Sequence, residues 1–191
     1  MTKTEICNRA LALLGHDRAI TAYEDASDAS TEAVRCRQFL DAAIQDVLSA
    51  HDWDFAAEET TICAAPPDAR GFARLPVPAD MLRFVSATDA MGNPLEVRRN
   101  RDCLSVRTCG AECTLRYVSR DVTPDVFPHK FAEAVVARLA FLLAGPMFGN
   151  DAKTDNFYQL SCSRTAEAVQ AESEETAFRG KWENPLTKAR R

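Results

Sequence analysis

The chain has 191 residues, a formal net charge of −5, 46% hydrophobic residues and 27% charged residues. This length and composition suit one globular domain, or one domain with a sizeable insertion, and exclude a disordered chain. Proteins that grip nucleic acid through its phosphates usually carry a basic surface. The acidic balance therefore argues against extensive DNA binding and leaves room only for a local basic patch.

No membrane span or export signal is expected. Residues 1–5 lack the basic and apolar regions of a signal peptide. The longest apolar stretch, residues 131–148, is interrupted by Glu133, Arg138 and the pair Gly145-Pro146. So broken a stretch is unsuited to crossing a bilayer.

The seven cysteines favour reduced thiols over disulfides, because their number is odd and no secretion signal precedes them. Cys7 and Cys36 are predicted on apolar helix faces, where cysteine acts as a small hydrophobe. Cys103, Cys109 and Cys113 cluster and invite a zinc interpretation. Without a Cys-x-x-Cys pair or a nearby histidine, we expect no metal site there.

The first helix is predicted to begin at a capping box, with Thr2 as N-cap and Glu5 reaching back to it. Gly15 supplies the left-handed residue that ends the helix. Its apolar face is formed by Ile6, Ala10, Leu13 and Leu14. Residues 17–28 are acidic and indicate a solvated connection.

The second helix is predicted to begin at Ser27 or Asp28. Its apolar stripe consists of Ala33, Cys36, Leu40, Ala43, Ile44 and Val47. Trp53 and Phe55 follow it and are expected to be core anchors.

From residue 58 onward the pattern changes to the alternation typical of strands. Strands are predicted at 60–63, 82–88 and 95–99, with turn residues at 91–94. A hairpin is predicted to pair 103–107 with 113–118 through Cys109-Gly110. In that last strand Cys113, Leu115 and Tyr117 face one way, and Thr114 and Arg116 face the other.

Two further helices are predicted after Pro124. Pro128 suits the first helical position of one, and Gly145-Pro146 is expected to end it. Its broad apolar surface predicts a central place in the helical layer: Phe131, Ala132, Val135, Val136, Leu139, Leu142 and Leu143. The last helix is capped by Asn150 or Asp151 and is mostly polar. The tail beyond Phe178 has five basic residues and one acidic residue, with Trp182 and Leu186 between them.

These elements predict an α+β fold. An antiparallel helical bundle, discontinuous in sequence, is formed by residues 1–56 and 122–178. A small antiparallel β region is inserted at 57–121, and a flexible basic arm occupies 179–191.

No strong catalytic motif is present. His16, His51 and His129 all lie at predicted helix ends, where capping or surface roles are expected. Ser105 and Ser119 lack a nucleophile elbow. Glu58 and Glu59 are adjacent on a strand and point to opposite faces, so they cannot flank one glycosidic bond.

Several segments together resemble, in their order along the chain, a family of phage head-to-tail adaptors. The family includes the tail tubular protein A and head-completion (packaged-DNA stabilisation) proteins of short-tailed phages. The segments are residues 5–11 through Leu14-Gly15, Glu24-Asp25, 33–40, 51–56, Leu75-Pro76 to Leu82-Arg83, 115–117 and the helix from Phe131. The chain departs from the family in its many cysteines and in the stretch 64–67.

The resemblance implies a structural virion protein, assembled in the host cytoplasm, that docks on the portal protein as a twelve-fold ring. It would extend the DNA channel, with DNA passing through without sequence-specific binding, and hold a downstream tail or nozzle protein. In the family the C-terminal segment reaches toward the portal. Carried over to this sequence, the portal-binding residues are Lys181, Trp182, Leu186, Lys188, Arg190 and Arg191.

Two other classes of function remain open at this stage. One is a tail-associated peptidoglycan hydrolase, since lytic activity is attributed to some relatives, and the other is a small nucleic-acid-binding module. Neither has a motif in the sequence. We expect no catalytic residue, no metal, no cofactor and no membrane partner.

Overall fold

The computed structural model describes residues 1–25, 27–63, 65–100, 103–107, 112–149 and 151–181. This part of the chain has an α+β fold: four α-helices, with two small antiparallel three-stranded sheets inserted between the second and third. The predicted fold class is confirmed. The chain divides into a helical unit, Met1–His51 with Thr123–Arg191, and a β unit, Asp52–Val122. The sequence had placed these boundaries after residues 56 and 121.

Helix α1, Lys3–Leu13, begins at the predicted capping box. The Glu5 amide donates to Thr2 Oγ1 at 3.2 Å, and the Thr2 amide donates to Glu5 Oε2 at 2.7 Å. Gly15 ends the helix with a φ of +79°. The connection that follows is less solvated than predicted, because Ile20 and Tyr23 are buried.

Helix α2, Thr31–Leu48, begins two residues later than the later of the two predicted caps allows. Ser30 is the N-cap, and its hydroxyl accepts a hydrogen bond from the Ala33 amide. Asp28 instead forms a turn, accepting from the Ser30 amide at 3.0 Å. Short polar side chains often compete for the backbone in this way before a helix. The predicted apolar stripe of this helix is buried throughout.

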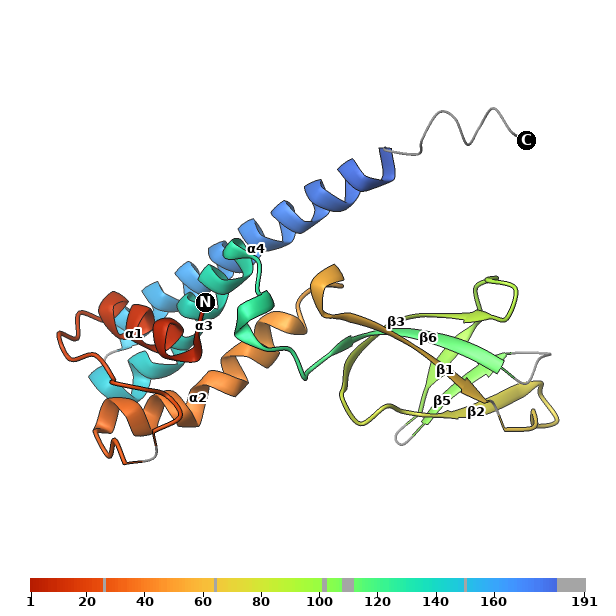
Figure 1. The fold of residues 1–191 in the computed structure, drawn as a ribbon, viewed down its shortest axis with the longest axis horizontal. Coiled ribbons are helices and arrows are strands. Elements are labelled where there is room, and N and C mark those ends of the chain that lie inside the picture. Colours follow the sequence, from red (N-terminus) through yellow and green to blue (C-terminus); the bar gives the residue numbers. More distant parts are fainter. Residues whose placement is uncertain (26, 64, 101–102, 108–111, 150, 182–191) are drawn as a thin grey trace. The chain divides into compact units, whose positions relative to one another are not determined.

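Helix α3, His129–Phe148, packs against α1, α2 and α4 and is the centre of the helical unit, as predicted (Figure 1). Pro128 is its N-cap rather than its first helical residue. The helix continues through Pro146 and ends at Phe148, with Gly149 as its C-cap at a φ of +57°. The prediction that Gly145-Pro146 ends the helix is therefore wrong. Proline already has a helical φ, and near a helix end it removes only one hydrogen bond.

Helix α4, Asp151–Lys181, is the last element and pairs with α3. It extends through the first three residues of the segment that the sequence predicts as a flexible arm. In the part of the chain that the structure describes, no helix is both long and apolar enough to cross a membrane.

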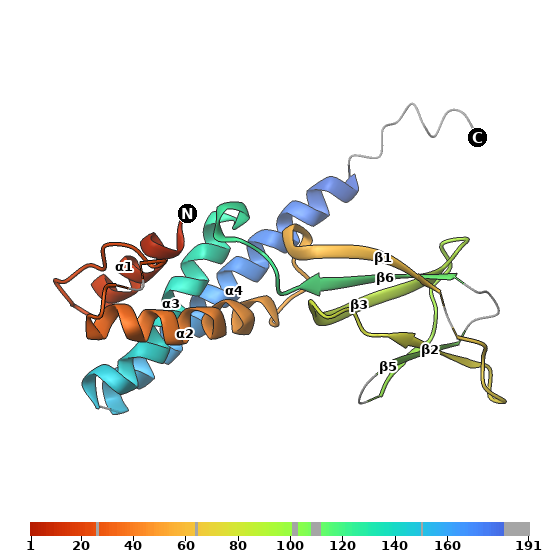
Figure 2. The ribbon, with the colours of Figure 1, turned by 60° about the horizontal axis from the view of Figure 1, so that its bottom comes forward.

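The β unit contains two antiparallel sheets whose strand orders are β1-β6-β3 and β2-β5-β4 (Figure 2). The strands are β1 Ala57–Cys63, β2 Phe72–Pro76, β3 Met81–Asp89, β4 Val97–Arg99, β5 Cys103–Arg107 and β6 Glu112–Ser119. One buried cluster draws side chains from both sheets, including Leu75 and Leu104 of one and Leu115 and Tyr117 of the other. The two sheets therefore form a small sandwich around a common core.

The predicted hairpin between β5 and β6 is wrong, because the two strands belong to different sheets. Strand β5 pairs with β2, matching it along all five residues, and with β4. Strand β6 is longer and pairs with β1 and β3. Each strand thus pairs with partners that suit its length, while their apolar faces meet across the core. The predicted alternation within β6 is confirmed, since Cys113, Leu115 and Tyr117 are buried.

Asp80 ties the start of β3 to the end of β6. Its Oδ2 accepts hydrogen bonds from the Ser119 hydroxyl at 2.8 Å and the Tyr117 hydroxyl at 3.0 Å. Burial alone would raise the pKa of Asp80, but these hydrogen bonds and its own backbone amide outweigh burial and lower the pKa. Burial, together with the hydrogen bond to Asp80, raises the pKa of Tyr117 to about 12.

This arrangement predicts a stability that depends on pH. The folded-state pKa of Asp80 lies below its unfolded value of about 3.9. Its contribution is therefore complete above that value and is lost as the pH falls through the folded-state pKa. We expect Asp80→Asn to lower the urea midpoint at neutral pH, and the difference from the parent to shrink in acid. A difference that stays constant with pH would contradict this assignment.

Candidate functional site

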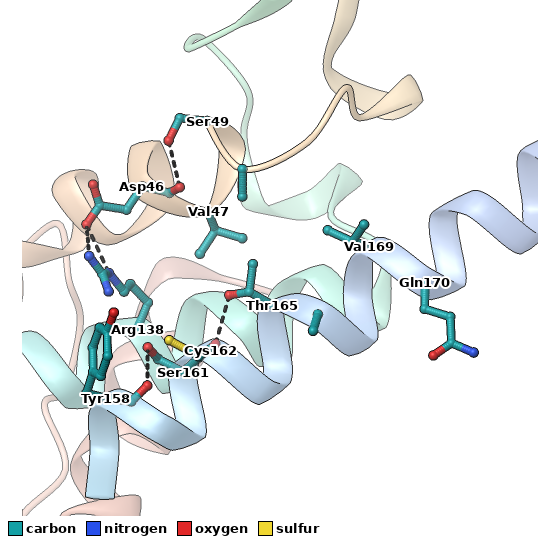
Figure 3. Close-up of a pocket in the computed structure, with 12 residues that line it drawn as sticks. Asp46, Val47, Ser49, Arg138, Tyr158, Ser161, Cys162, Thr165, Val169 and Gln170 are labelled. Carbon is teal, nitrogen blue, oxygen red and sulfur yellow. Dashed lines mark hydrogen bonds and ion pairs between the residues drawn. The ribbon is translucent and has the colours of Figure 1, made fainter. Parts of the chain in front are cut away.

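The helical unit carries a groove of about 680 Å³ between α2 and α4, with Arg138 of α3 among its lining residues (Figure 3). The groove forms because α2 and α4 both pack against α3, on one side of that helix. The lining residues are Asp46, Val47, Ser49, Ala50, Arg138, Tyr158, Ser161, Cys162, Thr165, Ala166, Val169 and Gln170.

At one end of the groove, Arg138 makes several contacts with neighbouring side chains. Its Nε and Nη2 atoms donate to Asp46 Oδ2 at 2.9 and 2.8 Å, which joins α3 to α2. The guanidinium also lies 5.1 Å from the centre of the Phe141 ring, a cation–π distance. The Phe141 ring in turn lies 5.3 Å from the Tyr158 ring of α4. A single chain of contacts therefore links the three helices at this end.

Two hydroxyl groups that line the groove form hydrogen bonds within α4. Ser161 Oγ donates to the Tyr158 carbonyl at 2.9 Å, and Thr165 Oγ1 donates to the Ser161 carbonyl at 2.8 Å. The apolar surface that remains for a ligand is that of the half-buried Val169 and the exposed Ala50 and Ala166, with the exposed Cys162 beside it, while Val47 is buried. Such a groove suits an apolar group of a partner and holds no nucleophile paired with a base.

The residues weighed for catalysis or metal binding are spread over the fold. His16 follows α1, His51 follows α2, and His129 begins α3. Glu58 and Glu59 lie opposite Tyr117 and Arg116 in the β1–β6 pairing, on opposite faces. Cys103 and Cys113 are in different sheets, and Cys109 lies outside the described residues. Among the described residues, no group of three or more His, Cys, Asp or Glu side chains could hold a metal ion.

The predicted portal-binding residues fall at and beyond the end of α4. Lys181 is the last residue of the helix. Trp182, Leu186, Lys188, Arg190 and Arg191 lie outside the described residues. Just before them, Ser173 to Ala177 are exposed on consecutive positions of α4. The sequence from Arg179 onward therefore follows a helical segment that is open to solvent on all sides.

Sequence reasoning did not predict the groove. Its signal was present in α4, where Tyr158, Cys162, Thr165 and Val169 recur at helical spacing and share one face. Tyrosine, cysteine and threonine are polar or mixed in character, so these positions do not form a clear apolar stripe in the sequence. Arg138 was seen only as an interruption of an apolar stretch. Comparison of the chain with models of protein families and with curated proteins finds no match.

Proposed function

We propose that the chain is a structural virion protein, a head-to-tail adaptor that docks as a ring on the portal. In this role it extends the DNA channel and provides the platform for a downstream tail or nozzle protein. The proposal rests on the order in which the helices and the β unit follow one another along the chain. Two N-terminal helices and two C-terminal helices form one unit, a β unit is inserted between them in the sequence, and the last helix is followed by a basic terminus.

The positions of the sequence motifs support this proposal. The block 5–15 is helix α1 with its glycine stop. Residues 51–56 span the passage from the helical unit into the β unit. Residues 115–117 lie in β6, the central strand of its sheet. These three segments that resemble the adaptor family thus lie in the first helix and its stop, at the passage between the two units and in a central strand.

Helix α4 supports the role of the C-terminal segment as a portal-binding arm. At 1.5 Å per residue, its 31 residues span about 46 Å. The side chains of Ser173 to Ala177, near its end, are exposed. The basic charges after it would speed the encounter with an acidic portal surface, while Trp182 and Leu186 would prolong the bound state.

The residues that line the groove lack the geometry that the hydrolase alternative requires. A glycosidase needs two carboxyl groups about 5 to 10 Å apart across a cleft. Among the residues that line the groove, Asp46 is the one carboxylate, and it is paired with Arg138. Zymography on peptidoglycan tests this alternative directly. A cleared band from the purified chain would show that the chain is a hydrolase and does not have a structural role alone.

We expect the free protein to be a monomer or a weak oligomer, with ring formation dependent on the portal. Large exposed apolar side chains of the helical unit are scattered over separate elements: Leu13, Val34, Val126 and Tyr158. Stable oligomers usually bury a larger contiguous apolar surface. Sedimentation velocity at micromolar concentration should show a single chain, and a stable ring without portal would contradict the expectation.

A further inference from the structure

The outer face of the sheet β2-β5-β4 carries arginines in two adjacent rows. In one row Arg74 of β2 and Arg98 of β4 both lie opposite Ser105 of the central strand β5. In the next row Phe72 lies opposite Arg107. The Arg107 amide donates to the Glu96 carbonyl at 2.9 Å, which places Glu96 in the same row. Residues two apart on a strand share a face, so both rows point the same way.

That face is turned away from the core of the β unit. The alternate residues Ala73, Leu75, Leu104 and Val106 belong to the buried cluster between the sheets. Arg74, Arg98 and Arg107 are exposed. We call the surface formed by Arg74, Arg98 and Arg107, with Phe72, Glu96 and Ser105, the arginine face.

Two of its guanidinium groups are held in place before any ligand arrives. The Cζ atoms of Arg98 and Arg107 lie 4.4 and 5.7 Å from the centre of the Phe72 ring. The Glu96 carboxylate lies between them, 3.0 Å from Arg98 Nη2 and 3.6 Å from Arg107 Nη1. Stacking on an aromatic ring lowers the entropy that an arginine loses on binding an anion. Arg98 and Arg107 already bind the carboxylate of Glu96, and arginine binds phosphate groups through the same kind of charge-assisted hydrogen bond.

The local charge is opposite to that of the whole chain. Three arginines oppose the single carboxylate of Glu96, and at the edge Arg70 and Asp68 offset each other. The arginine face therefore has an excess of two positive charges on a protein of net charge −5. Arg74 and Arg98 are separated by two strand spacings, about 10 Å. The positive charge is thus spread along a surface rather than focused at one point.

We propose that the arginine face binds the phosphate backbone of a nucleic acid without reading its sequence. The face lacks an apolar anchor, because two guanidinium groups cover the Phe72 ring, and protein partners depend on such anchors for residence time. A regular polyanion needs none, because counterion release supplies its affinity. Ser105, only 9% exposed, accepts a hydrogen bond from Asn100 Nδ2 at 2.7 Å and is not placed to read bases. This binding goes beyond the adaptor role and does not depend on docking to the portal.

The test is the salt dependence of fluorescence anisotropy with labelled double-stranded and single-stranded oligonucleotides, using the intact chain. Three phosphate contacts predict a roughly 40-fold loss of duplex affinity between about 50 and about 200 mM salt. Arg98→Gln should reduce the slope of log K against log salt by about 0.9 for a duplex and about 0.7 for a single strand. Arg98→Lys should keep the slope. The combined Arg74, Arg98 and Arg107 to Gln variant should lose binding.

Arg99→Gln is the matched control, since Arg99 is exposed on the same strand but adjacent to Arg98, on the other face. It should leave the slope unchanged. A second control replaces Lys188, Arg190 and Arg191 by Gln, because the C-terminal segment is also basic. The proposal is overturned if the triple arginine variant, with an unaltered melting curve, binds DNA as the parent does. It is also overturned if the intact chain binds polyglutamate but no oligonucleotide.

Discussion

A chain truncated after Lys181 should fold normally and fail to assemble on the portal. The truncation keeps the whole of α4 and removes Trp182 and Leu186 with the basic residues that follow. If the removed residues form the flexible arm that the sequence predicts, they add little to stability, so the free energy of unfolding should change by less than about 0.5 kcal/mol. Loss of one aromatic anchor at an interface typically costs 2 kcal/mol or more, about 30-fold in affinity. Losing both anchors and the charges should abolish cosedimentation with portal.

Two partial variants separate the contributions of the segment. Replacing Lys188, Arg190 and Arg191 by Gln should slow association with the portal and remove its dependence on salt. Replacing Trp182 and Leu186 by Ala should leave the association rate unchanged and speed dissociation. If the truncated chain still assembles fully on portals, the C-terminal segment is only a solvated end and the portal-binding surface lies elsewhere.

Trp53→Ala should destabilise the fold by about 3 to 5 kcal/mol, the usual cost of removing a buried aromatic side chain. Trp53 is 1% exposed, is among the largest fully buried side chains, and lies 6.0 Å from the Phe55 ring. It is the N-cap of the short 3-10 helix η1, Asp54–Ala56, which leads into β1. For a protein of this size the loss corresponds to a fall in melting temperature of roughly 6 to 20 °C.

Met91→Ala is the matched control for that substitution. Met91 is also a large apolar residue of the β unit, but it is 89% exposed in the turn after β3. Its removal should shift the melting temperature by no more than a degree or two. An unchanged melting temperature for Trp53→Ala would show that the indole is not a core anchor and would assign it to an interface.

Local sequence patterns correctly predicted the features that depend on a single segment of the chain. The capping box of Thr2 and Glu5, the stop at Gly15 and the buried stripe of α2 were all predicted, because each depends on residues within one or two helical turns. The same holds for the alternation of Cys113, Leu115 and Tyr117 in β6. The α+β class follows from these segments taken together.

Local sequence patterns did not predict which distant segments of the chain pair with one another. Strands β5 and β6 are neighbours in sequence and favour a hairpin, yet their partners are chosen by strand length and by the core that both faces share. Strand β2 was missed because it is short and ends at Pro76. The groove and the arginine face depend on residues such as Asp46 and Arg138, or Phe72 and Arg98, that only the fold brings together.

The most direct test of the adaptor role is the mass of the intact chain alone and after mixing with its cognate portal, measured by native mass spectrometry. The account predicts a single chain in isolation and a complex of defined mass with portal, in which twelve copies are bound. Failure to associate with the portal at micromolar concentration would contradict the central claim.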